Sequence, residues 1–460
     1  MPDITKGPAW TQQVPHGDVV RAAPLIDDQK NIYVTTIAGR SYKLSEDGKV
    51  LWSHETGTRG TVPQAPSLWE SKLLLLTKLG YLIGVNIETG TEAWAYQIAP
   101  MVAGSADCAL LTQGLIIVAV LDPVPVKLLS DPMAAHAVGN NRIMALSVAE
   151  KSVRWTYAPK QPLYNFQGAT IHDGTFVFQD MTGGVYRLST EGRLIWYSVT
   201  LDRESGTTAG AVIQDGRVFV VSNLGGGPQL GKEGRGVLHV YDYEDGTFLW
   251  LQDLPYEGNQ AVAVGNIPGN EGRTSLILGM GKNPGVPVMV NMVGWMASVF
   301  PFFDVHIGLI FLPFHLLSLS FPSLFAKKQG RSIVALDAAT GKVLWYYEME
   351  PYQRPAAMGD SENLLERVKS TMDGSNPNNE PWCLPDANAQ PVIDGEGTAF
   401  VPFQDGKVYA LRDENGDGKI SPEEVREHLV GAAFQASAAM APGLLALVDC
   451  SGRLEVFRAP

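Results

Sequence analysis

Cysteine is scarce in this chain, which has three among its 460 residues: Cys108, Cys383 and Cys450. Their wide spacing and odd number fit neither a CxxC metal pair nor a disulfide framework, so we expect buried thiols. The sequence also contains no Asn-x-Ser/Thr sequon and no basic segment followed by an apolar one at its start. A glycosylated secreted protein is therefore not indicated, and the sequence assigns no compartment.

Positive charge is also in short supply. Lysine and arginine number 35 against 48 aspartates and glutamates, which gives a net charge of −13. A nucleic-acid partner needs a basic face for its phosphates, so we expect none. The eight histidines are scattered, with no HExxH motif or paired spacing. We therefore expect no histidine metal site and assign no catalytic residue from the sequence.

Turn-forming residues, by contrast, are plentiful, with 48 glycines and 30 prolines. Six segments repeat one pattern: an alternating strand, a tight turn rich in Asp, Glu and Gly, and a second strand that ends in tryptophan. Shorter β-rich runs precede most copies, so each unit holds four strands. Adjacent copies without insertions are about 41 residues apart, a spacing typical of β-propellers. The six closing residues are Trp52, Trp94, Trp155, Trp196, Trp250 and Trp345.

Two further units bring the expected number of blades to eight. The last unit stops one strand short at the end of the chain, and "GPAWTQQV" near the start supplies a strand with Trp10 at the closing position. Pairing this strand into the last blade would close the ring and remove an open sheet edge. We therefore predict an all-β, eight-bladed propeller of four-stranded blades over residues 1–460, with small helical insertions.

The segment "IVALDAATGKVLW" (residues 333–345) resembles the pyrroloquinoline-quinone (PQQ) repeat of the quinoprotein-like propellers. This resemblance specifies the fold, but the family contains both dehydrogenases and non-enzymatic scaffolds such as the outer-membrane assembly lipoprotein. The dehydrogenases hold PQQ between a tryptophan and a disulfide of adjacent cysteines. Because this chain has no adjacent cysteines, the resemblance implies neither PQQ nor an enzyme, and no catalytic or cofactor-binding residue is carried over.

Two insertions interrupt the repeat. Residues 283–329, in the sixth blade, are apolar, and 305–326 lack any charge before Lys327 and Lys328. We consider three hypotheses for this insertion: a membrane contact through residues 286–326, a gene-model artefact such as a retained intron, and a buried or partner-binding insert. Residues 351–385 form the second insertion, for which we predict a short helix followed by a loop.

The seventh unit contains "DENGDGKISPEE", whose spacing resembles an EF-hand calcium loop at every ligand position. Gly418 supplies the sharp bend and Ile420 an apolar anchor. "SPEEVREHLV" after it predicts an exit helix, so 413–430 would be half an EF-hand that replaces a propeller turn. The expected calcium ligands are Asp413, Asn415, Asp417, Lys419 through its carbonyl, Ser421 and Glu424.

These observations together favour a calcium-binding propeller that acts as a non-catalytic binding or scaffold protein. We expect a protein partner on a propeller face or loop, because insertions gather there. Two alternatives stay open: a quinone-dependent oxidoreductase and a membrane-tethered assembly factor.

Overall fold

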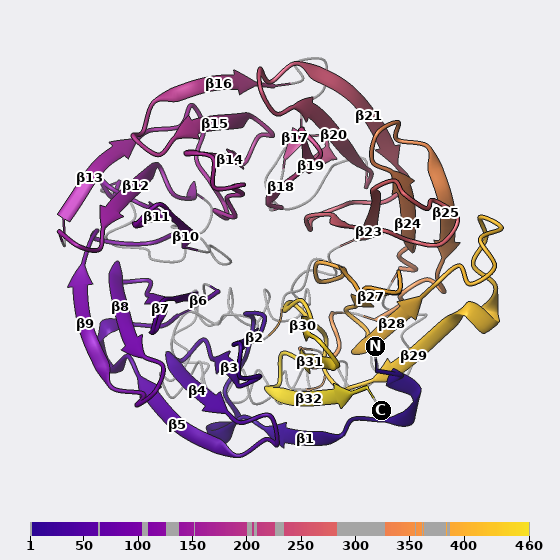
Figure 1. Ribbon diagram of the computed structural model, residues 1–460, viewed down its shortest axis with the longest axis horizontal. Coiled ribbons are helices and arrows are strands. Elements are labelled where there is room, and N and C mark those ends of the chain that lie inside the picture. The colour runs from indigo at the N-terminus through magenta and orange to yellow at the C-terminus, as the bar shows by residue number, and fades with distance from the viewer. Residues whose placement is uncertain are drawn as a thin grey trace, which may run out of the picture.

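Eight β-sheets stand around a central axis, each running from the centre of the ring to its rim (Figure 1). The computed structural model describes residues 2–62, 65–103, 109–125, 138–150, 152–199, 205–206, 209–225, 234–282, 327–354, 356–360, 362, 383 and 387–459. The predicted eight-bladed all-β propeller is thereby confirmed.

In blades 1 to 7 the strands follow the chain from the inner to the outer position, whereas in blade 8 the N-terminal strand β1 is outermost. Blade 1 contains β2 (Leu25–Ile26), β3 (Ile32–Thr35), β4 (Arg40–Leu44) and β5 (Val50–Glu55), and blade 2 contains β6 (Ser67–Trp69), β7 (Lys72–Leu76), β8 (Tyr81–Asn86) and β9 (Glu92–Gln97). Blade 3 contains β10 (Leu110–Thr112), β11 (Leu115–Val120), β12 (Arg142–Ser147) and β13 (Ser152–Tyr157). Blade 4 contains β14 (Thr175–Gln179), β15 (Val185–Ser189) and β16 (Leu194–Ser198). Blade 5 contains β17 (Ser205–Gly206), β18 (Ala211–Gln214), β19 (Arg217–Leu224), β20 (Gly236–Asp242) and β21 (Phe248–Leu254). Blade 6 contains β22 (Ala263–Gly265), β23 (Ser275–Gly281), β24 (Arg331–Asp337) and β25 (Val343–Glu348), and blade 7 contains β26 (Val392–Ile393), β27 (Ala399–Pro402), β28 (Lys407–Leu411) and β29 (Val425–Leu429). Blade 8 contains β30 (Ala439–Ala441), β31 (Leu444–Val448), β32 (Arg453–Arg458) and β1 (Trp10–Gln13). Among the described residues, four single turns of 3-10 helix are defined: η1 (Ile4–Lys6), η2 (Pro15–Gly17), η3 (Gly57–Arg59) and η4 (Pro422–Glu424).

In the part of the chain that the structure describes, six sheets have four strands, blade 4 has three and blade 5 has five. The N-terminal strand β1 pairs antiparallel with β32, and Trp10 lies opposite Val456. Both chain ends therefore lie on the same side of the ring, as Figure 1 shows. This pairing confirms the predicted closure and gives the last sheet its fourth strand.

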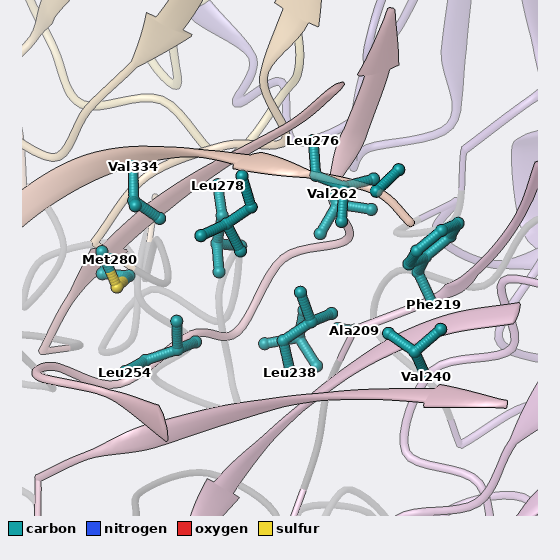
Figure 2. Close-up of a cluster of buried hydrophobic side chains, with 13 residues drawn as sticks. Ala209, Phe219, Leu238, Val240, Leu254, Val262, Leu276, Leu278, Met280 and Val334 are labelled. Atoms are coloured by element: carbon teal, nitrogen blue, oxygen red, sulfur yellow. The ribbon is translucent and has the colours of Figure 1, made fainter. Parts of the chain in front are cut away.

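Apolar side chains of neighbouring sheets interlock at each junction between blades. Figure 2 shows the junction of blades 5 and 6, where Leu238 and Val240 of β20 face Leu276, Leu278 and Met280 of β23. All five side chains are fully buried. Each contributes about 1.5–3 kcal/mol by leaving water, so the packed faces, more than the short inner strands, stabilise the ring.

A tryptophan and a glycine join most neighbouring blades near the rim. The closing tryptophan of one blade lies on a glycine in the last turn of the next blade, and the indole N–H often donates to a carbonyl of that turn. Trp52, for example, donates to the Ile87 carbonyl at 2.8 Å. A Cβ built on Gly90 would approach the Trp52 ring to 2.7 Å, so only glycine fits there. The five such pairs are Trp10 with Gly48, Trp52 with Gly90, Trp155 with Gly192, Trp196 with Gly246 and Trp250 with Gly341.

The junction between blades 7 and 8 lacks this tryptophan. Arg426 pairs with Ala410 at the position where Trp345 pairs with Ala335 in blade 6. The N-terminal segment packs here instead: Ile4 of η1 is 1% exposed and belongs to a cluster of buried side chains from both blades. Figure 1 accordingly places the N-terminus beside β29.

A disulfide bond between Cys383 and Cys450 also ties these two blades together, with the Cα atoms 5.3 Å apart. The expectation of free thiols is wrong for this pair, whereas Cys108 lies outside the described residues. The two cysteines are separated by 67 residues, a spacing that carries no signal. The fold brings them together because Cys383 precedes blade 7 while Cys450 lies in the turn between β31 and β32.

The two predicted insertions fall largely outside the described residues. This applies to 283–326 of the first and to most of 351–385, so the membrane, artefact and partner-binding hypotheses stay predictions, as does the short helix. Among the helices that the structure describes, none is long and apolar enough to cross a membrane.

Candidate functional site

The predicted calcium loop lies between β28 and β29, where other blades have the turn before their last strand. The segment thus occupies the place of a propeller turn, whereas its identity as a calcium loop stays a prediction. The predicted exit helix, however, is wrong. η4 makes one 3-10 turn, and β29 follows at once and pairs with β28 along its whole length. The loop therefore has a strand on each side, because pairing with β28 overrides the helical preference of "SPEEVREHLV".

The loop folds around the side chain of Asp413, which is 2% exposed. Its Oδ1 accepts from the backbone N–H of Asp417 at 3.1 Å, and its Oδ2 from that of Gly418 at 2.9 Å. The Asn415 side-chain oxygen also accepts from the Asp417 N–H, at 2.9 Å. Asp417 in turn accepts from the Lys419 N–H at 2.9 Å. Four of the six predicted positions thus belong to one hydrogen-bonded loop.

Glu424 closes the loop from its far end. Its two carboxylate oxygens accept from the backbone N–H groups of Ser421 and Glu414, both at 2.8 Å. The backbone hydrogen bond from Ser421 holds the pKa of Glu424 below its ordinary value. Positions 9 and 2 of the loop are thereby tied to position 12, and the carboxylate stays ionised near neutral pH.

Three carboxylates, one amide, one hydroxyl and one main-chain carbonyl make up the predicted set of ligands. All are hard oxygens, the chemistry that Ca²⁺ prefers. Within the described part of the chain, no group of three or more His, Cys, Asp or Glu is arranged so that it could hold a metal ion. The loop thus contains the donor types that calcium prefers, but they are not gathered into a metal site in the described structure, and calcium binding stays a prediction.

Contacts with blade 6 hold the loop in place. Ile420 packs against the buried cluster that contains Trp345, as expected of an apolar anchor. A Cβ on Gly416 would lie 3.5 Å from the Gly269 Cα, and one on Gly418 would lie 3.0 Å from the Leu344 carbonyl oxygen. The loop thus bridges the two outer strands of blade 7 and rests on its neighbour.

A second candidate site occupies the centre of the ring, in a cavity of about 270 Å³. Gln260, Gln390 and Gln435 contribute amides from blades 6, 7 and 8, and Arg21 contributes one positive charge. None of the described residues that line it carries a carboxylate, an imidazole or a thiol. This lining favours hydrogen bonding to a neutral or anionic group over acid–base chemistry. The full lining is Arg21, Ala22, Ala23, Ala65, Asn165, Gln167, Gly168, Gly210, Ala211, Gln260, Ala261, Gln390, Gln435, Ala436 and Ser437.

These amides are absent from the sequence-based site predictions. A signal was nevertheless present, because each glutamine is followed by Gly, Ala or Pro shortly before the first strand of its blade: "FQGA", "NQAV", "AQPV" and "FQAS". Small residues there leave room at the axis, and the amides line the same cavity.

A family model described as "Outer membrane protein assembly factor BamB" matches residues 4–190 and 181–274, together more than half of the chain. The chain belongs to this family of PQQ-repeat propellers. No curated protein matches the sequence significantly.

Solved structures of the same fold include proteins with and without enzymatic activity. BamB from Moraxella catarrhalis is 14% identical with a TM-score of 0.58, and the match covers 98% of this chain and 99% of that one. Quinohemoprotein alcohol dehydrogenase from Comamonas testosteroni is 12% identical with a TM-score of 0.59, over 98% and 76% of the two chains. The computationally designed Ika8 protein is 11% identical with a TM-score of 0.58, over 97% and 98%. At such identities the likeness concerns the fold alone.

Proposed function

We propose that this PQQ-repeat propeller binds calcium at the 413–424 loop and acts as a non-catalytic binding or scaffold protein. The observation that carries the calcium proposal is the closed hydrogen-bond pattern of the loop. Asp413, Asn415, Asp417 and Glu424 accept backbone N–H groups from the loop itself. The fold therefore already orders the loop, so calcium binding would lose little further conformational entropy.

Calcium would join the two outer strands of blade 7. Asp413 comes two residues after the end of β28, and Glu424 directly precedes β29. An ion held by both would fix this hairpin and, through Ile420, its packing on blade 6. We therefore assign calcium a structural role at the junction of blades 6 and 7.

Thermal unfolding of the full chain with calcium and with a chelator tests this proposal. A ligand at a hundred times its Kd stabilises the folded state by about 2.7 kcal/mol, so the melting temperature should rise with calcium. Asp413→Ala and Glu424→Gln should each abolish the rise. Asp245→Ala, in an exposed turn of blade 5, should retain it. A wild-type protein that melts at one temperature under both conditions rejects the site.

The same measurement has a predicted pH dependence. Because the pKa of Glu424 is lowered in the folded chain, its ionised form stabilises the loop above the ordinary value of 4.5. That contribution is lost as the pH falls through the lowered pKa. The calcium-dependent rise should thus be constant from neutral pH to about 5 and disappear below 4.5; a loss near pH 6.5 would contradict this assignment.

The scaffold proposal rests on the chemistry of the chain. The sequence has no adjacent cysteines, and the described residues that line the central cavity offer no carboxylate as a base. The alternative, a quinone-dependent oxidoreductase, predicts dye-linked dehydrogenase activity after reconstitution with PQQ and calcium. Turnover in that assay would replace the scaffold proposal.

Partners and location are proposals too. We propose a protein partner on a propeller face or loop, which a pull-down with and without calcium would identify. The second alternative is a membrane-tethered assembly factor, and the apolar sequence of residues 286–326 supports it. Fractionation of the chain with and without residues 283–326 separates the two: loss of membrane association on deletion favours the tether.

A further inference from the structure

The junction between blades 2 and 3 departs from the tryptophan–glycine pattern. A glycine stands four residues before the closing tryptophan in blades 1, 2, 4, 5 and 6, but Lys151 stands four residues before Trp155 in blade 3. At the five glycine junctions a Cβ would come within 2.6 to 2.9 Å of the indole. The sequence of blade 3 therefore lacks the glycine on which the indole lies at those five junctions.

The tryptophan of this junction, Trp94, lies on its own sheet instead. Its cross-strand partner is Gly84, and a Cβ on Gly84 would collide with the Trp94 ring. The ring also stacks on Tyr96, with centroids 5.4 Å apart. Its N–H has no hydrogen-bond partner among the described residues. In blades 1, 3, 4, 5 and 6 the corresponding partners carry side chains: Lys43, Ala145, Arg187, Val240 and Ala335.

A pocket of about 250 Å³ lies between blades 2 and 3. A cavity of about 150 Å³ lined by Leu, Ile and Phe is large enough to bind benzene. This pocket, which also contains the polar side chains of Gln97 and Ser147, has room for an indole. No charged side chain is among the described residues that line it. The principal walls are Leu82, Trp94 and Tyr96 from blade 2, and Ile116, Leu146 and Val148 from blade 3.

Val148 gives the pocket one directional contact. It stands seven residues before Trp155, as Ile87 does before Trp94 and Tyr243 before Trp250. The Ile87 and Tyr243 carbonyls accept the docked indole N–H at 2.8 and 2.9 Å. The Val148 carbonyl therefore occupies the position of an indole acceptor in a junction where no indole is docked.

We propose that this pocket binds a small, uncharged, planar aromatic molecule of indole size, which donates one N–H to the Val148 carbonyl. Apolar walls select an uncharged ring, because burying a charge without a partner is costly. The stacked rings of Trp94 and Tyr96 select a planar one. This proposal is independent of calcium binding, because the pocket and the 413–424 loop belong to different blades.

Isothermal titration of the full chain with indole and with 1-methylindole tests the proposal. Indole should bind with a Kd below about 1 mM. 1-Methylindole cannot donate, so it should bind several-fold more weakly, as expected for one hydrogen bond worth about 0.5–1.5 kcal/mol. No indole binding in this range, or equal affinities for the two compounds, would overturn the proposal.

Two matched variants locate the site. Val153 lines the pocket and is 47% exposed, two residues before Trp155. Val50 is 39% exposed at the same position of blade 1. Val153→Phe should fill the pocket and weaken indole binding at least about tenfold, while Val50→Phe should leave it unchanged. Equal effects of the two variants would overturn the assignment, as would anomalous bromine density for 5-bromoindole in crystals at any place other than between blades 2 and 3.

Discussion

Loss of the Cys383–Cys450 disulfide should markedly destabilise the junction of blades 7 and 8. The bond closes a loop with a sequence separation of 67. Restricting the unfolded chain over such a loop is worth about 4 kcal/mol at 25 °C. Both cysteines are buried, at 0% and 2% exposure, so alanine replacements avoid leaving a polar group unsatisfied in the core.

Urea unfolding of the double variant Cys383→Ala, Cys450→Ala measures this contribution. Tryptophan fluorescence and far-UV circular dichroism should be followed together, because their coincidence justifies a single free energy of unfolding. The oxidised wild type should be more stable than the double variant by up to about 4 kcal/mol, and a reductant should remove most of the difference. Cys108→Ala, which keeps both bridge cysteines, should behave as the wild type.

The result that would refute this reasoning is equal stability of the oxidised wild type and the double variant. That outcome would mean that the packing of Ile4 and the contact of His428 with Glu455, 2.7 Å apart, hold the two blades together without the covalent bond.

Two further predictions concern the packing between blades. Gly90→Ala should destabilise the ring by about 1–3 kcal/mol in thermal or urea unfolding, because the new Cβ would overlap the Trp52 ring. The control Gly114→Ala is also at positive φ but has nothing within 4 Å, so it should cost less. Equal losses of stability would contradict the packing of Trp52 on Gly90 as the cause. Arg331→Ala should lower the free energy of unfolding by about 3–5 kcal/mol, because the guanidinium lies 2.6 Å from the Asp405 carboxylate and both side chains are largely buried. A decrease below about 1 kcal/mol would show that the ion pair is solvated.

The sequence predicted the ring well because each blade repeats a local pattern. The tryptophan that ends most units is a strong sequence marker and joins most neighbouring blades, and the spacing between Trp10 and Trp52 predicted the closure by the N-terminal strand. The same comparison of repeats located the 413–424 loop at a propeller turn.

The failures arose where contacts between distant segments decide the structure. "VREHLV" has helical propensity, but pairing with β28 makes it a strand. Cys383 and Cys450 meet only because blades 7 and 8 are neighbours. The amides of Gln260 and Gln390 lie 130 residues apart in the chain, and they share a cavity only because inner strands converge at the axis.

Closure by β1 sets a condition on how the chain can be made. The partner of Trp10 is Val456, so the first strand of the propeller pairs with the last strand of the propeller. At a rate of synthesis of about 5–20 residues per second, β32 is made about 20 to 90 s after β1. Throughout that interval the unpaired β1 and the first blade beside it are open to other strands. Ring closure is therefore a step that only the full-length chain can take, and one at which two nascent chains in close proximity could exchange their first strands.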